Sequence, residues 1–91
     1  MTDAEVRDAA IEALDSLPDW ARERLGDVAV IVEESHPDRL MGVYDPVGGI
    51  KRIVIFRDAN PSAAEVRRTV LHEVGHHFGM GEEHLGELGY G

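Results

Sequence analysis

The sequence contains no cysteine among its 91 residues, so it can form neither a disulfide bond nor a thiolate metal site. This absence suits a reducing compartment, and we expect a cytoplasmic protein. The first ten residues lack the positively charged and then apolar segments of a signal peptide. No apolar run approaches the ~20 residues that a transmembrane helix needs. The sequence therefore predicts a soluble protein without a membrane partner.

Basic residues are also scarce, because nine lysines and arginines face eighteen acidic residues and give a net charge of −9. Phosphate binding needs clustered basic side chains, so this balance argues against a nucleic-acid partner. The same charge mildly favours the attraction of a cation, although most of it simply keeps a small protein in solution.

Apolar residues make up 43% of the chain and recur in periodic blocks, which predicts a folded protein with a single domain over residues 1–91. The motifs Thr2-x-x-Glu5 and Ser62-x-x-Glu65 are capping boxes that begin helices. Short β-branched segments indicate strands. In chain order we expect a helix from residue 2, a short helix over 18–25, strands over 28–34, 40–45 and 50–58, a long helix over 62–79, and a short helix over 82–88. This order predicts an α+β fold, with a small sheet of about three strands packed on helices.

The long predicted helix contains the sequence His72-Glu73-x-x-His76. At 100° per residue, one stripe of this helix is apolar and should face the sheet: Ala63, Val66, Val70, Val74 and His77. His72 and His76 fall on the opposite side, one helical turn apart, where both imidazoles can reach one metal ion. Glu73 lies beside that ion and is better placed to act on a metal-bound water than to bind the metal.

The other two histidines near these elements are interpreted differently. His77 lies close to the apolar stripe, so we expect it to pack in the interior rather than bind metal. His36 lies in a predicted loop beside Pro37 and should be solvated.

A catalytic zinc site usually has three protein ligands and one open position. The candidates for the third ligand are Glu82, Glu83 and His84, which follow Gly79. Gly79 can adopt a left-handed conformation, so the chain can fold back toward the ion.

The segment "RRTVLHEVGHHFGMGEEHL" resembles the signature of the small bacterial zincin-like metallopeptidases, and "EALDSLPDWARERLGDVAVIVEE" is similar to their usual opening. The resemblance implies a minimal zincin-like fold and the pattern H-E-x-x-H-x-x-G-x-x-D. This pattern places His72, His76 and Glu82 as metal ligands and Glu73 as the catalytic base, with Glu82 in the position of the aspartate. His84 remains the alternative third ligand.

The sequence therefore predicts a zinc metallopeptidase in which Glu73 activates a metal-bound water against a peptide bond of a peptide or protein substrate. The alternative is a zinc-stabilised binding module with little catalysis, because small domains often gain folding energy from an ion. A hydrolase of a non-peptide amide is a third possibility. Two imidazoles and a carboxylate would also accept divalent ions other than zinc. The substrate and the oligomeric state are not predicted.

Overall fold

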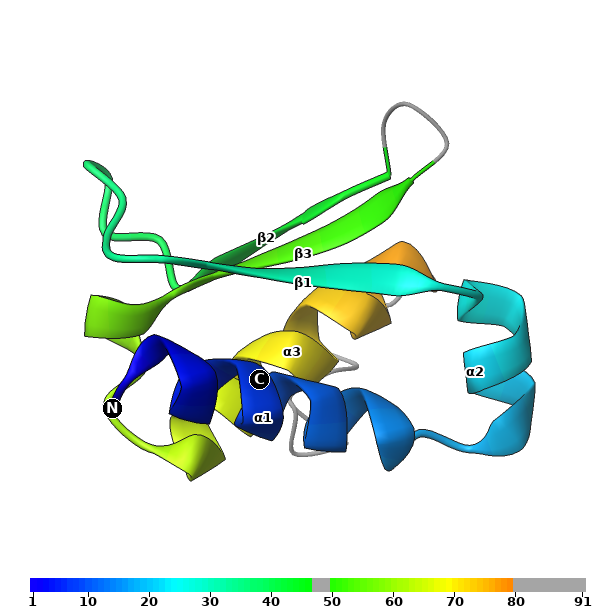
Figure 1. Cartoon of the computed structure of the whole chain (residues 1–91). Coiled ribbons are helices and arrows are strands. Elements are labelled where there is room, and N and C mark those ends of the chain that lie inside the picture. The colour runs from blue at the N-terminus through cyan, green and yellow to red at the C-terminus, as the bar shows by residue number, and fades with distance from the viewer. Residues whose placement is uncertain (47–49, 80–91) are drawn as a thin grey trace.

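The computed structural model describes residues 1–46 and 50–79. Figure 1 shows a sheet above a layer of helices, with a short helix at one end. The helices are α1 (Asp3–Asp15), α2 (Asp19–Leu25) and α3 (Ala63–His77), and the strands are β1 (Val28–Glu33), β2 (Gly42–Asp45) and β3 (Lys51–Phe56). A short 3-10 helix over Arg57–Ala59 leads from β3 toward α3. The α+β class is thus confirmed, and the helix expected over 82–88 lies outside the described residues.

The helices begin where the capping motifs predicted. The Thr2 Oγ1 accepts a hydrogen bond from the Glu5 amide at 3.1 Å, and the Thr2 amide donates to Glu5 Oε1 at 2.8 Å. At the start of α3, Ser62 Oγ accepts from the Glu65 amide at 3.2 Å. These bonds satisfy amides that the first turn of a helix leaves without a partner.

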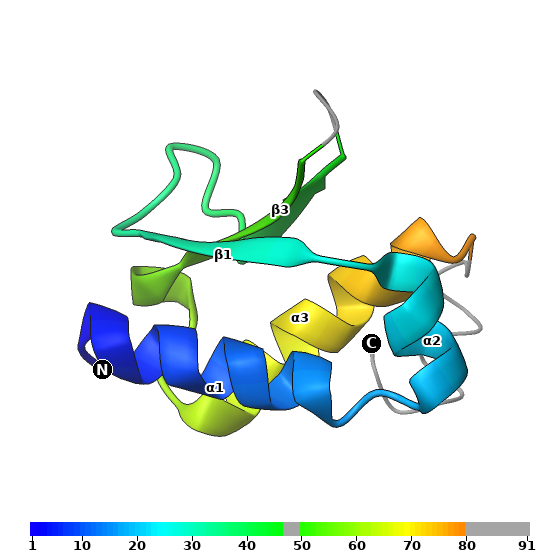
Figure 2. The same cartoon turned by 45° about the vertical axis from the view of Figure 1, so that its right-hand side comes forward.

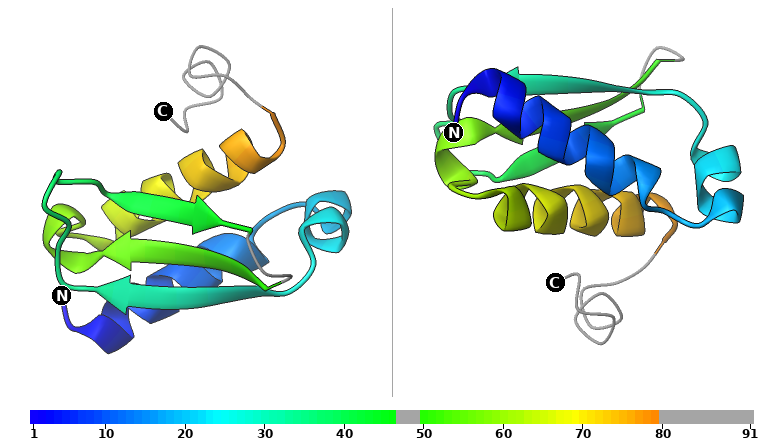
Figure 3. Two further views of the ribbon diagram at one scale, coloured as in Figure 1. Left: turned by 90° about the horizontal axis from the view of Figure 1, so that it is seen from above. Right: turned by 60° about the horizontal axis from the view of Figure 1, so that its bottom comes forward.

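The sheet has the order β1-β3-β2, with β1 parallel and β2 antiparallel to β3 (Figure 3, left). β1 is an edge strand, and none of its residues is fully buried, although its first five residues are apolar. One face of β1 packs on the helices, whereas Ala29, on the other face, is exposed.

The core lies between the sheet and the pair formed by α1 and α3, which run side by side beneath it (Figure 3, right). Val66, Val70 and Val74 of α3 are buried, as the helical periodicity predicted. Ala63, at the start of the same stripe, is exposed. From α1 the core receives Val6, Ala10 and Ala13, and from β3 it receives Ile53 and Ile55.

Figure 2 shows α2 beside the C-terminal end of α3. The Trp20 ring of α2 lies 5.6 Å from the Phe78 ring, centroid to centroid. Phe78 directly follows α3 as its C-cap residue, so α2 supports the end of the helix that contains the two histidines.

β2 approaches α3 so closely at Gly42 that no side chain fits there. A Cβ atom at this position would lie 2.7 Å from Thr69 Cγ2 and 3.1 Å from the carbonyl oxygen of Val54. Gly42 therefore allows the edge strand to pack directly over the helix.

Replacing Gly42 by alanine should lower the free energy of unfolding by about 1–3 kcal/mol, because the added methyl group overpacks this contact. Urea unfolding would measure the loss. The matched double variant Gly42→Ala/Thr69→Ser removes the methyl group that would clash, so it should be less destabilised than the sum of its single variants. Additive effects of the two substitutions would contradict the close contact.

Candidate metal centre

His72 and His76 face each other on the surface of α3, one helical turn apart. Their Nε2 atoms are 3.0 Å apart, and their ring centroids are separated by 4.6 Å. His72 is half-buried and His76 is exposed, so the pair opens toward solvent rather than into the core. The structure thus brings the two predicted ligands together on the side of α3 away from its buried valines.

The donor pair fits a zinc ion in both chemistry and spacing. Two nitrogens bound to zinc at 2.0–2.1 Å in a tetrahedron lie about 3.3 Å from each other. The observed separation of 3.0 Å differs from this by an amount that small ring rotations can supply. Neutral imidazole is also the commonest metal ligand in proteins.

The three candidates for a third ligand, Glu82, Glu83 and His84, lie outside the described residues. Within residues 1–46 and 50–79, no three histidine, aspartate or glutamate side chains gather in a way that could hold a metal. A complete zinc site would therefore need a ligand from residues beyond Gly79.

Gly79 turns the chain at the position that the sequence predicted. Its φ angle is +79°, in the left-handed region, and its amide donates to the carbonyl oxygen of His76 at 2.9 Å. A non-glycine residue would be strained in this conformation. The helix therefore ends directly after the two histidines, and the chain leaves its axis there.

A pocket of about 280 Å³ lies beside the histidine pair and includes Glu73 in its lining. Its walls come from α3 and from the segment that leads into β2: Leu40, Met41, Gly42, Arg68, Thr69, His72 and Glu73. His72 and Glu73 thus both border this cavity. The sequence analysis did not identify Leu40, Met41 or Thr69, because nothing local in the sequence predicts that residues about 30 positions apart will meet.

Tyr44 and His77 pack against each other next to this site. Their ring centroids are 4.8 Å apart, and the His77 ring also lies 5.1 Å from that of Phe78. The Tyr44 hydroxyl is buried and has no hydrogen-bond partner in the described part of the chain, and burial raises the pKa of this phenol. His77 thus packs against neighbouring rings, as predicted, but it is half-buried rather than interior. Tyr90, the other phenol, lies outside the described residues.

His36 differs from its expected role as a solvated loop residue. Its Nδ1 accepts a hydrogen bond from the Asp38 amide at 3.0 Å, and its ring packs edge-on against Phe56 at 5.1 Å. The side chain therefore shapes the loop before β2.

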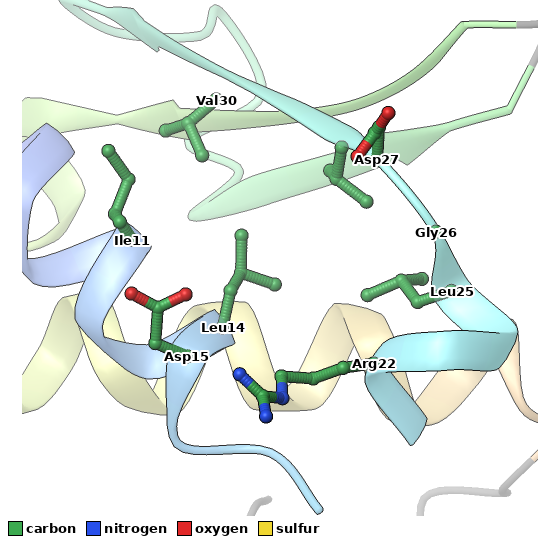
Figure 4. A pocket seen from close by; sticks show the side chains of 9 residues that line it. Ile11, Leu14, Asp15, Arg22, Leu25, Gly26, Asp27 and Val30 are labelled. Carbon is green, nitrogen blue, oxygen red and sulfur yellow. The ribbon is translucent and has the colours of Figure 1, made fainter. Parts of the chain in front are cut away.

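A second pocket, of about 200 Å³, lies between α1, α2 and β1 (Figure 4). Ile11, Leu14 and Val30 supply apolar walls, and Arg22 lies at its border. The Arg22 guanidinium pairs with Asp19 at 2.6 Å. This pocket contains no histidine and no residue of α3, so it is not a part of the candidate metal centre.

None of the helices within residues 1–46 and 50–79 has the length and apolar character needed to cross a bilayer.

A search of curated proteins found no match to this chain. A family model described as "Zincin-like metallopeptidase" matches residues 48–91, which include β3, α3 and the whole H-E-x-x-H sequence. The resemblance seen in the sequence is thus confirmed over residues 48–91, where the chain is similar to the zincin-like metallopeptidase family.

Proposed function

We propose that the protein is a zinc-dependent metallopeptidase that hydrolyses peptide bonds, with Glu73 as its catalytic base. The observation that supports this most directly is the pair of Nε2 atoms 3.0 Å apart, with Glu73 one residue from His72 and lining the adjacent pocket. A site with a purely structural metal has no need of a carboxylate at that position.

In this proposal His72 and His76 hold the zinc, with Glu82 as the third ligand. Zinc, when bound, would supply a Lewis acid that polarises both the attacking water and the substrate carbonyl group. Glu73 would accept the proton of the water as its oxygen attacks the peptide carbonyl carbon. The same carboxyl group would then donate that proton to the leaving amine as the C–N bond breaks.

An edge of the sheet offers a place for the substrate backbone. β3 is not such an edge, because it is the central strand and pairs with a neighbour on both sides. The edge nearest α3 is β2, and Gly42 belongs both to this strand and to the pocket beside Glu73. An extended peptide paired with β2 would run past the catalytic base.

The test is the cleavage of an unbiased peptide pool by the zinc-loaded protein, with and without a zinc chelator. We expect cleavage that disappears on chelation and returns when zinc is restored. The exposed position of His76 should allow this exchange under native conditions. Bound zinc without chelator-sensitive cleavage would support the zinc-stabilised binding module instead.

A further inference from the structure

Asn60 is a polar residue with no exposed surface, and its side chain joins three separate segments of the chain. Its Nδ2 donates to the carbonyl oxygens of Met41 at 2.9 Å and Phe56 at 2.8 Å. Its Oδ1 accepts a hydrogen bond from Thr69 Oγ1 at 2.6 Å. Both donor hydrogens of the amide are thus used, and its oxygen accepts one hydrogen bond.

These bonds connect the two walls of the pocket beside Glu73. Met41 belongs to the wall that precedes β2, and Thr69 belongs to the wall formed by α3. The Met41 carbonyl oxygen also accepts from the Phe56 amide at 3.1 Å, which fixes the same segment to the end of β3. The separation of the two walls is therefore set by a buried side chain that does not itself line the pocket.

The pocket has an apolar interior and charged groups at its border. Leu40, Met41 and Gly42 form one wall without a charge, and both large side chains remain 41% exposed. On the helix, Arg68 is half-exposed and pairs with Glu65 at 3.4 Å. Pockets of this kind select apolar side chains, because burial in the interior removes apolar surface from water.

We propose that Asn60 is a positioning residue that holds the Leu40–Gly42 wall, so that the pocket accepts an apolar substrate side chain beside Glu73. The inference rests on the proposed peptidase function, and it adds a substrate class: peptides with an apolar residue next to the cleaved bond. In this role Asn60 acts through Met41 and Thr69, the two pocket residues to which it is hydrogen-bonded.

The direct test uses two small probes of nearly equal shape, the amides of N-acetyl-leucine and N-acetyl-asparagine. Amide shifts in NMR spectra of the whole protein report binding at Gly42 and Thr69 and need no turnover. The leucine probe should bind about tenfold more tightly than the asparagine probe, because only its side chain gains from burial. Equal binding of both probes, or shifts that avoid these residues, would overturn the assignment of the pocket.

The role of Asn60 is tested by Asn60→Asp, which removes both Nδ2 donors, and by Thr69→Val, which removes the hydroxyl donor at nearly constant volume. Each variant should reduce the preference for the leucine probe to about twofold or less, since the wall is no longer held. Val6→Ala is the matched control, because it alters a buried residue of α1 outside the pocket and should keep the preference. If Asn60→Asp does not fold, Thr69→Val decides. A folded variant with the parent's preference would overturn the positioning role.

Peptide cleavage separates this inference from the proposed function. If the parent protein cleaves peptides with leucine and peptides with asparagine beside the cleaved bond at equal rates, that result would reject the inference and leave the proposed peptidase function standing. Selective binding of the leucine probe without any cleavage would reject the peptidase and leave an apolar binding pocket.

Discussion

Glutamine in place of Glu73 should reduce peptide turnover by about a thousandfold, because proton transfer by a positioned base contributes about 10²–10⁴-fold to a reaction of this kind. The amide has nearly the same shape as the carboxylate but cannot accept the proton of the attacking water. Glu73 stands next to His72 on α3 and lines the pocket, so its loss removes a base without removing a ligand. The affinity for zinc should therefore stay within about tenfold of the parent's value.

The measurement pairs kcat for a cleaved peptide with the dissociation constant of zinc from calorimetry. Glu23→Gln is the matched control, because it makes the same chemical change at an exposed position of α2 and should leave both values unchanged. Should Glu73→Gln cleave the peptide as fast as the parent, the proposed mechanism would be wrong.

The sequence predicted the elements well because their signals are local. Capping residues mark the starts of α1 and α3, and helical periodicity identifies Val66, Val70 and Val74 as the buried face of α3. Local signals do not predict the order of the strands in the sheet, because that order depends on pairings between residues far apart in the sequence. The apolar run of β1 resembles that of a central strand, yet β3 is central because it pairs with β1 on one side and β2 on the other.

The candidate site likewise has one part that the local sequence predicts and another that only the fold determines. The spacing of His72 and His76 determines their proximity as soon as the segment is helical, and the 3.0 Å between their Nε2 atoms follows from one helical turn. The pocket beside them depends instead on the packing of the Leu40–Gly42 segment over Thr69. Asn60 was not predicted from the sequence, because its three side-chain contacts come from segments that only the fold brings together.

Removal of either histidine should have the largest effect on the metal. Structural zinc sites bind with about 10–16 kcal/mol, or about 3 kcal/mol for each of four ligands, so His72→Ala or His76→Ala should weaken zinc binding by about 100-fold or more. Both variants should also lose chelator-sensitive cleavage. His77→Ala is the matched control on the same helix, because the His77 ring packs against Tyr44 and Phe78 instead of facing the other two rings.

Measurements of zinc affinity also identify the third ligand. The candidates for it are in the segment after Gly79. Glu82→Ala should weaken zinc binding by about 100-fold, by the same division of the binding energy, whereas His84→Ala should leave it nearly unchanged. The reverse outcome would assign His84 as the ligand and would leave the roles of His72 and Glu73 as proposed. Zinc binding that survives both substitutions and also survives His76→Ala would contradict a metal centre at the end of α3, and the peptidase proposal would have to be abandoned with it.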